Sequence, residues 1–291
     1  MSRNGLVRYR PMARRAVVTV PLATLWASPE RERAETQVLL GDALLVDETR
    51  DGWLRVVAVG QPSGTRDPRG YPGWLPAARA ASPEPPADGP RVMVDAVETV
   101  LDGRVPLDGV AFGTGLISLG EPGGGVCDVA VPGLPGRYRV PERDIVKAPR
   151  GTPDGASVLA MARRFLGVPF LWGGLSPRGF DCSGLVHAAY RRCGLTVPRD
   201  AHAQFEAATR VPPGEEQPGD LLFFAPPEEP VQHVGFFAGD GLMLDACPRT
   251  GEVVLHQIDG DRRATAVGAG RFHRRVPGAL SPAGGMTFGR K

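Results

Sequence analysis

The stretch FDCSGLV, from Phe180 to Val186, places a thiol between a carboxylate and a hydroxyl. A Gly-rich loop, VPFLWGGLSPRG (168–179), precedes it, and the segment LVHAAYRRCGL (185–195) that follows has apolar residues at helical spacing. This pattern predicts a helix that begins at the stretch and ends near Gly194. Cys182 is therefore expected at a helix N-terminus, where the backbone N–H groups favour a thiolate.

Composition limits the class of protein. The chain has 291 residues, of which 42% are hydrophobic and 23% charged, as in a globular protein of two or three domains. A net charge of only +2 predicts no nucleic-acid partner, and the lack of a run of 18 apolar residues predicts no membrane span. The four cysteines lack C-x-x-C spacing, so neither a metal site nor another cofactor is implied.

The first half of the chain is predicted to be β-rich. Residues 36–59 hold two apolar runs broken by Gly41-Asp42 and Asp51-Gly52, and Asp-Gly between apolar runs indicates a hairpin. With DGWLRV (51–56) and GYPGWLP (70–76), this segment resembles a bacterial SH3-like barrel. Residues 92–147 repeat the same pattern of short apolar runs and turns more loosely. The predicted divisions are a basic extension (1–15), a first SH3-like domain (16–80), a Pro-rich linker (81–91), a second SH3-like domain (92–148), a third domain (149–278) and a disordered tail (279–291).

The third domain changes pattern. Helices are predicted at 157–167, from Cys182 onward and at 201–210, and apolar strands follow them. The strands are expected at 220–226, 233–240, 241–248, 251–258 and 269–276. Helices followed by an antiparallel sheet make an α+β domain.

A nucleophilic cysteine needs a base and a group that orients the base. His233 opens one predicted strand, and Asp245 lies in an otherwise apolar context on the next. A three- or five-residue loop centred on Gly239 would place the two directly opposite each other, whereas a tight Asp240-Gly241 turn would not. Asp245 could then hold the imidazole in one tautomer, the alternative being an Asp that caps the strand end.

Five blocks in this domain occur in the order typical of one family. They are LGVPFLWGG (166–174), GFDCSGLVHAAYRRCGL (179–195), VPRDA (197–201), PGDLLFF (218–224) and HVGFFAGDG (233–241). Together, over residues 157–276, they resemble the NlpC/p-sixty family of papain-like cysteine peptidases. The resemblance implies a papain-like fold, with Cys182 as the nucleophile, His233 as the base and Asp245 in the third polar position.

The GYPGW piece (70–74) narrows the resemblance to the YkfC-type γ-D-glutamyl-L-diamino acid endopeptidases, whose partner is a murein peptide with a free N-terminal L-Ala. An anionic group facing an α-ammonium is a charge-assisted pair. The residues implied at the substrate are Asp181, Ser183, Tyr71, Glu35, Trp172 and Asp200. The alternatives are a barrel-core aromatic for Tyr71 and a solvated acid for Glu35, since PERERAE (29–35) is typical of a solvated loop.

Three positions depart from the family pattern. Asp245 stands where the family usually has His, and Ala201 where relatives often have Ser. Phe170 stands where the family usually has Tyr, whose hydroxyl can support the oxyanion. Loss of one such donor costs about 2.7–4 kcal/mol of transition-state stabilisation if nothing replaces it.

The sequence thus predicts a cysteine peptidase that forms an acyl-enzyme and recycles murein peptides. The alternatives are an inactive peptidoglycan-binding protein, a secreted wall hydrolase and, remotely, an acyl transferase. The basic N-terminus and the apolar segment AVVTVPLATLWA (16–27) partly resemble a signal peptide, but Thr19, Pro21 and Thr24 interrupt it and its β-branched residues favour a strand. A cytoplasmic location is therefore expected, with secretion as the alternative.

Overall fold

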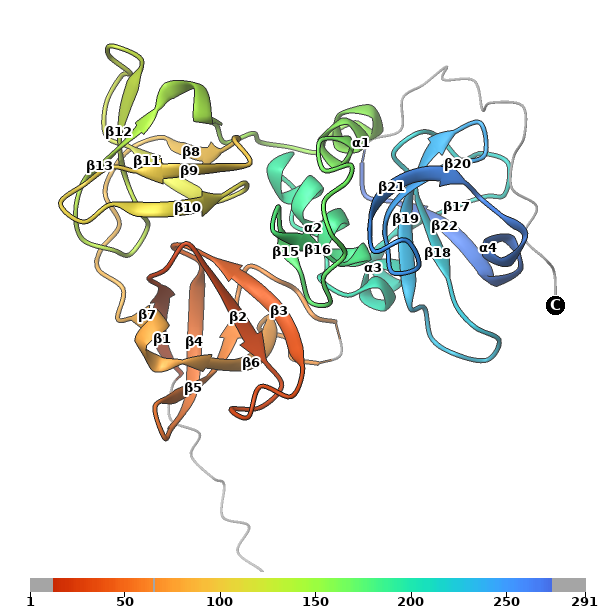
Figure 1. The fold of residues 1–291 in the computed structure, drawn as a ribbon, viewed down its shortest axis with the longest axis horizontal. Helices are drawn as coiled ribbons and strands as arrows, with labels where there is room; N and C mark the ends of the chain where they lie inside the picture. The colour runs from red at the N-terminus through yellow and green to blue at the C-terminus, as the bar shows by residue number, and fades with distance from the viewer. Residues whose placement is uncertain (1–12, 65, 274–291) are drawn as a thin grey trace, which may run out of the picture.

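A computed structural model describes residues 13–64 and 66–273. The predicted tail and most of the predicted N-terminal extension lie outside these residues. Two β-rich units precede a mixed α/β unit, and helices α1, α2 and α3 lie between the β-rich units and the large C-terminal sheet (Figure 1). Within the described residues, every helix is too short or too polar to cross a membrane.

The first unit is a seven-stranded antiparallel sheet with the strand order β3-β2-β6-β5-β4-β1-β7. Its elements are β1 (Arg14–Val18), β2 (Leu22–Trp26), β3 (Ala34–Leu39), β4 (Ala43–Arg50), β5 (Trp53–Ala58), β6 (Tyr71–Pro76), η1 (Ala77–Arg79) and β7 (Ala80–Ala81). Apolar residues alternate along these strands and form one core, which includes Val18, Leu25, Val56 and Tyr71. The predicted hairpin turn at Asp51-Gly52 joins β4 to β5, and both residues have positive φ, as a tight hairpin turn requires.

The second unit has a five-stranded sheet with the order β13-β12-β11-β8-β14 and a separate hairpin of β9 and β10. Its elements are β8 (Arg91–Val94), β9 (Glu98–Leu101), β10 (Leu107–Ala111), β11 (Gly115–Ser118), β12 (Val126–Ala130), β13 (Tyr138–Pro141), η2 (Glu142–Asp144) and β14 (Ile145–Lys147). The SH3-like character of both units and the exact domain boundaries stay predictions.

The third unit packs helices against a six-stranded antiparallel sheet with the order β17-β22-β18-β19-β20-β21. Its elements are α1 (Gly155–Arg163), β15 (Leu175–Ser176), β16 (Gly179–Phe180), α2 (Cys182–Arg192), α3 (Ala201–Ala207), β17 (Thr209–Val211), β18 (Leu221–Phe224), β19 (His233–Gly239), β20 (Leu242–Cys247), β21 (Glu252–Gln257), α4 (Gly260–Thr265) and β22 (Ala266–Arg271). Helix α2 is buried along most of its length, so it is the central element of this core. The mixed α/β class predicted from the sequence is confirmed.

Some predicted details of the third unit were wrong. Helix α1 begins at Gly155 because Asp154 caps it by accepting a hydrogen bond from Ser157 N, two residues before the predicted start. The sequence analysis did not predict α4, whose cap is Asp259. The β19–β20 turn is the tight Asp240-Gly241 turn, in which both residues have positive φ, and not the longer loop centred on Gly239.

The register of this hairpin follows from its tight turn. Phe236 pairs with Leu244 and Phe237 with Met243, so His233 and Asp245 are not directly opposite each other as predicted. Extending the same register places Gly235 opposite Asp245, with His233 two residues further along the same face. The two side chains are therefore diagonal neighbours, which long side chains can bridge.

Candidate active site

Cys182 is the first residue of α2, as predicted. Asp181 is the N-cap, and its Oδ1 accepts a hydrogen bond of 2.6 Å from Gly184 N. A Cβ at Gly184 would lie 2.0 Å from the carbonyl oxygen of Gly174, so only glycine lets the preceding loop approach the helix this closely. The DCSG sequence therefore places the thiol at the helix start and packs the Gly-rich loop against it.

The thiol is not activated by its helix position alone. Burial is the main reason that the pKa of Cys182 is raised to about 12, and the negative charge of Asp181 adds to the effect. Backbone hydrogen bonds at Val234 and Ser183 act in the opposite direction but do not outweigh burial. Backbone N–H groups at the helix start do favour a thiolate, as expected, but desolvation of the charged form is the larger effect. A base beside the sulfur is needed to take its proton.

His233 and Asp245 are in contact despite the wrong register prediction. His233 Nε2 lies 2.5 Å from Asp245 Oδ2, and both side chains are almost completely buried. Gly235 has no side chain to separate them, and a Cβ there would lie 3.0 Å from Asp245 Cβ. Burial lowers the pKa of His233 below its ordinary value, although Asp245 acts to raise it. The neutral imidazole is therefore the favoured form of His233 in this structure.

A second histidine, His256 on β21, contacts the same carboxylate. Its Nε2 lies 2.8 Å from Asp245 Oδ1, so each oxygen of Asp245 faces one imidazole. Burial alone would raise the pKa of Asp245, but hydrogen bonds from His233 and His256 outweigh it and hold that pKa below its usual range. His256 lies in the strand predicted at 251–258, and no catalytic role was predicted for it.

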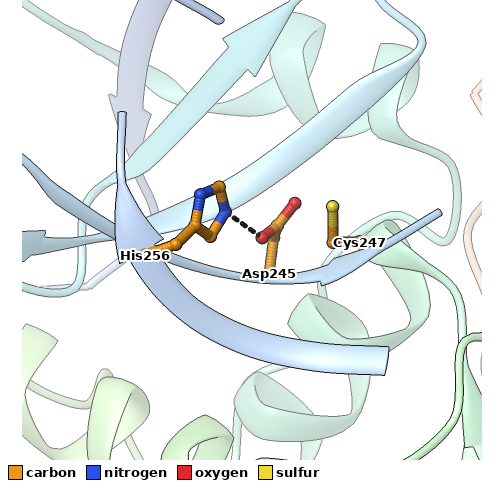
Figure 2. Close-up of side chains that lie close together, drawn as sticks. All are labelled: Asp245, Cys247 and His256. Atoms are coloured by element: carbon orange, nitrogen blue, oxygen red, sulfur yellow. Dashed lines mark hydrogen bonds and ion pairs between the residues drawn. The ribbon is translucent and has the colours of Figure 1, made fainter. Parts of the chain in front are cut away.

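Asp245, His256 and Cys247 lie together on the β20–β21 hairpin, as Figure 2 shows, with their ligand atoms within 4.8 Å of one another. These residue types suit Zn²⁺. However, Arg262 Nη2 lies 3.7 Å from Asp245 Oδ2 and 4.0 Å from Cys247 Sγ, so a permanent cation already faces the carboxylate and the sulfur. We therefore derive no step that involves a metal.

Cys182 and His233 line one cleft with a volume of about 530 Å³, a size typical of small-ligand sites. The first unit and the third unit both contribute to its walls. All six predicted substrate-binding residues line it, which are Asp181, Ser183, Tyr71, Glu35, Trp172 and Asp200. Phe170 and Ala201, two of the positions that depart from the family pattern, line it too.

Arg199 organises the floor of one end of this cleft. It is fully buried and donates to Asp181 in a two-pronged ion pair, with Nη1–Oδ1 and Nη2–Oδ2 distances of 2.9 and 2.7 Å. Its Nε donates to Thr36 Oγ1 of the first unit at 2.8 Å, and Nη1 also reaches Ser183 Oγ at 3.1 Å. The charge of Asp181 is thus already balanced within the protein by Arg199, so Asp181 does not need a substrate ammonium group as its counter-ion.

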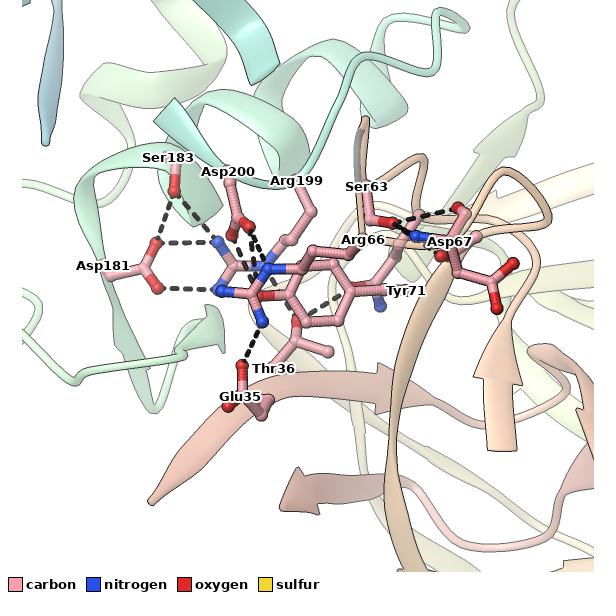
Figure 3. Close-up of polar contacts among 12 residues, drawn as sticks. Glu35, Thr36, Ser63, Arg66, Asp67, Tyr71, Asp181, Ser183, Arg199 and Asp200 are labelled. Carbon is pink, nitrogen blue, oxygen red and sulfur yellow. Dashed lines mark hydrogen bonds and ion pairs between the residues drawn. The ribbon is translucent and has the colours of Figure 1, made fainter. Parts of the chain in front are cut away.

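The same end of the cleft carries two further acids, Glu35 and Asp200, and arginines contact both (Figure 3). Arg66 bridges them, with 2.6 Å from Nη1 to Glu35 Oε2 and 3.0 Å from Nε to Asp200 Oδ2, and Arg33 also pairs with Glu35. Glu35 is therefore not the solvated loop acid of the alternative interpretation, since its side chain is only 7% exposed.

Tyr71 fits both interpretations given to it. Its ring is 1% exposed and belongs to the core of the first unit, while its hydroxyl lies 3.0 Å from Asp200 Oδ1. Burial and the nearby Asp200 raise the pKa of Tyr71, so the hydroxyl stays protonated and donates to the carboxylate. Asp200 is the N-cap residue of α3 but makes no side-chain cap bond, which leaves its carboxylate directed to Tyr71 and Arg66.

Trp172 is 65% exposed at the rim of the cleft, where a large aromatic can cover a bound ligand. The residues that the sequence analysis missed are Arg33, Arg66, Arg199, His256 and Arg262. Only Arg199 had a sequence signal, because it lies inside the VPRDA block. Arg66, His256 and Arg262 depend on contacts with acids of other strands or loops, whereas Arg33 pairs with Glu35, two residues away in the chain.

Comparisons with known proteins show which family the chain belongs to. The sequence model of a protein family described as "NlpC/P60 family" matches residues 167–267 of this chain. A protein of Bacillus subtilis named γ-D-glutamyl-L-lysine dipeptidyl-peptidase is 34% identical over 76% of this chain and 74% of its own length. A protein of the same name from Bacillus cereus is 32% identical over 76% of this chain and 69% of its own length. A crystal structure of an NlpC/P60 family protein from Bacillus cereus superposes with a TM-score of 0.82 at 26% identity, covering 89% of this chain and all of that chain.

Proposed function

Because the chain belongs to the NlpC/P60 family and is a cysteine peptidase, we propose that it hydrolyses the γ-D-glutamyl-L-diamino acid bond of murein peptides that carry a free N-terminal L-Ala. The observation that carries this proposal is the cleft that holds Cys182 and His233 together with the acids and the tyrosine contributed by both units. The names of two relatives that match three quarters of the chain support the same substrate class.

Acylation begins with a proton transfer from Cys182 Sγ to His233. Since Nε2 of His233 faces Asp245, Nδ1 is the nitrogen that receives the proton. The thiolate attacks the γ-carbonyl carbon of D-Glu, and a C–S bond forms as the carbonyl oxygen becomes an oxyanion. When the intermediate collapses, the C–N bond breaks and the diamino acid leaves as an amine after taking the proton from the His233 imidazolium.

Deacylation repeats the sequence with water. His233 takes a proton from a water molecule as its oxygen attacks the thioester carbon, and the C–S bond then breaks. Cys182 regains its proton, and L-Ala-D-Glu leaves with a new γ-carboxyl group. Asp245 accepts the Nε2–H bond throughout and stabilises the imidazolium in both half-reactions.

Stabilisation of the oxyanion relies on backbone N–H groups at the start of α2. Phe170 lines the cleft where the family resemblance places a tyrosine hydroxyl, and its ring offers no donor. The N–H of Cys182, at the positive end of the α2 dipole, therefore carries more of this task than it would with a tyrosine present.

The α-ammonium of L-Ala is proposed to bind Glu35 and Asp200, with the Tyr71 hydroxyl holding Asp200 in place. These two acids are bridged by Arg66, so the ammonium competes with an internal cation for them. A peptide whose amine is blocked lacks the charge that makes this exchange favourable.

The test is mass spectrometry of the purified protein with L-Ala-γ-D-Glu-L-Lys, with L-Ala-γ-D-Glu-meso-diaminopimelate and with an N-acetylated copy of each. Release of L-Ala-D-Glu from the free-amine peptides alone is expected, and Cys182→Ala should abolish it. Cleavage of the acetylated copies at equal rates would rule out the amine site but leave the peptidase. Cleavage of neither form would rule out this substrate class.

We also propose a cytoplasmic role in recycling murein peptides. The apolar segment at 16–27, which partly resembles a leader, contributes to β1 and β2, and its Val18 and Leu25 are buried in the first unit's core. Cell fractionation followed by N-terminal sequencing tests this location. Recovery of a processed chain from the culture medium would favour the secreted hydrolase instead.

A further inference from the structure

The hydrogen bonds of His256 identify its charge state. Its Nε2 lies 2.8 Å from a carboxylate oxygen of Asp245, and its Nδ1 lies 3.1 Å from the backbone carbonyl oxygen of Gln257. Neither a carboxylate nor a carbonyl oxygen can donate a hydrogen. Both ring nitrogens of His256 must therefore be donors, which makes the ring an imidazolium.

The surroundings of Asp245 include two other groups that matter to its charge. Arg262 of α4 lies 3.7 Å from Oδ2, and Cys247 lies two residues further along β20. His233 of β19 takes the hydrogen-bonding position on Oδ2, while His256 of β21 takes the one on Oδ1. The carboxylate that orients the base is thus shared between His233 and a second, protonated histidine.

We propose that His256 is a positioning residue of the peptidase: as an imidazolium held by the second oxygen of Asp245, it partly neutralises that carboxylate and so limits how strongly Asp245 favours the protonated form of His233. The proposal rests on the proposed function only in taking His233 as the catalytic base. It deepens that function by assigning a role to a side chain that does not line the cleft.

The direction of the electrostatic effects agrees with this geometry. The hydrogen bond to Asp245 is the main reason that the pKa of His256 is raised, which favours the imidazolium. Burial is the main reason that the pKa of His233 is lowered; Asp245 opposes it, while Arg262 and His256 add to it. As pH rises through the pKa of His256, Asp245 becomes less compensated and His233 holds its proton to a higher pH.

The experiment is the pH profile of kcat/KM for the full chain and for His256→Gln, which can still donate one hydrogen bond to Asp245 but carries no charge. Both limbs of the bell-shaped profile are expected to move to higher pH by about one unit, the size of effect that one nearby charge produces. His256→Lys keeps a positive charge and should leave the limbs near their wild-type positions. Arg263→Gln is the matched control, because it removes a cation of α4 whose Nε donates to the backbone carbonyl of Ile258 and not to Asp245.

A merely structural role for His256 gives a different result. Activity of His256→Gln would then fall by the same factor at every pH, and the two limbs would stay in place. That outcome, or an equal shift in Arg263→Gln, would overturn the proposal.

A second readout does not depend on activity. In the Cys182→Ala protein, nitrogen NMR of the histidine rings should show both nitrogens of His256 protonated near neutral pH. Adding His256→Gln should raise the pKa of His233 by about one unit. A neutral His256, or a His233 pKa that does not move, would overturn the proposal even if no peptide is cleaved. Loss of cleavage with the NMR shifts intact would instead count against the proposed substrate.

Discussion

The two ends of the cleft handle charge in different ways. At the end proposed to bind the substrate amine, the acids Glu35, Asp181 and Asp200 are each paired with arginines, and the contacts cross from the first unit to the third (Figure 3). At the catalytic end, Asp245 is bound by two histidines of its own sheet. The first arrangement uses cations that do not titrate near neutral pH, and the second uses groups that do.

This difference separates binding from chemistry. Arginine pairs give the amine end a charge distribution that does not change with pH but depends on the docking of two units. The histidine–aspartate–histidine set lies within one sheet, and its imidazoles respond to pH. Substitutions at the first end should therefore alter stability or KM, and those at the second should alter kcat and its pH dependence.

The largest effect is expected for Asp245→Asn. The Asn amide can donate to His233 Nε2, which would leave the proton on Nδ1 and stop that nitrogen from accepting the thiol proton. We expect kcat to fall by roughly 10⁴-fold with little change in KM, as measured by steady-state peptide hydrolysis. Asp240→Asn, in the exposed turn of the same hairpin, is the matched control. A loss of less than about tenfold would show that Asp245 does not orient the base.

The next effect concerns Arg199→Met, which leaves the half-buried Asp181 without its partner and removes the link to Thr36. Breaking such a buried pair is expected to lower the free energy of unfolding by about 3–5 kcal/mol, measured by urea denaturation. Arg191→Met removes the more exposed pair with Asp42 and should cost clearly less. Equal losses in the two variants would contradict the central role given to Arg199.

A smaller effect is expected for Tyr71→Phe, which removes the hydrogen bond to Asp200 without emptying the core. Hydrogen bonds to charged groups contribute about 1.5–3 kcal/mol, so KM for a free-amine peptide should rise by about tenfold while kcat changes little. Tyr138→Phe in the second unit is the control. If KM for the free-amine peptide does not rise, the hydroxyl does not serve the amine site.

The smallest effect is expected for Arg66→Ala. This side chain is partly exposed and occupies the two acids proposed to bind the substrate amine, so its removal should lower KM for free-amine peptides by about two- to fivefold. Arg69→Ala removes a neighbouring arginine that pairs with Asp47 and Asp67 instead. An increase in KM for Arg66→Ala would show that Arg66 binds the substrate and does not compete with it.

Much of the architecture was predictable from the sequence. Periodicity located α2 and the strands β18 to β22 because their burial follows from local apolar patterns, and the FDCSG motif placed Cys182 at a helix start because its cap and its glycine are local requirements. The family blocks also identified the cysteine peptidase family. The short helix α4 was missed, since its six residues, GDRRAT, include too few apolar side chains to form a helical period.

Only the tertiary structure decided the charge arrangement around these residues. The His233–Asp245 contact depends on a diagonal across Gly235 and a two-residue turn, and the raised pKa of Cys182 depends on burial that no motif reports. Arg66 pairs with Asp200, which lies far from it in the chain. His256 contacts Asp245, which lies on the neighbouring strand. The sequence by itself determined which groups are the candidates for the chemistry, because local motifs specify them. Desolvation and long-range pairing, which exist only after folding, decided their protonation and their partners.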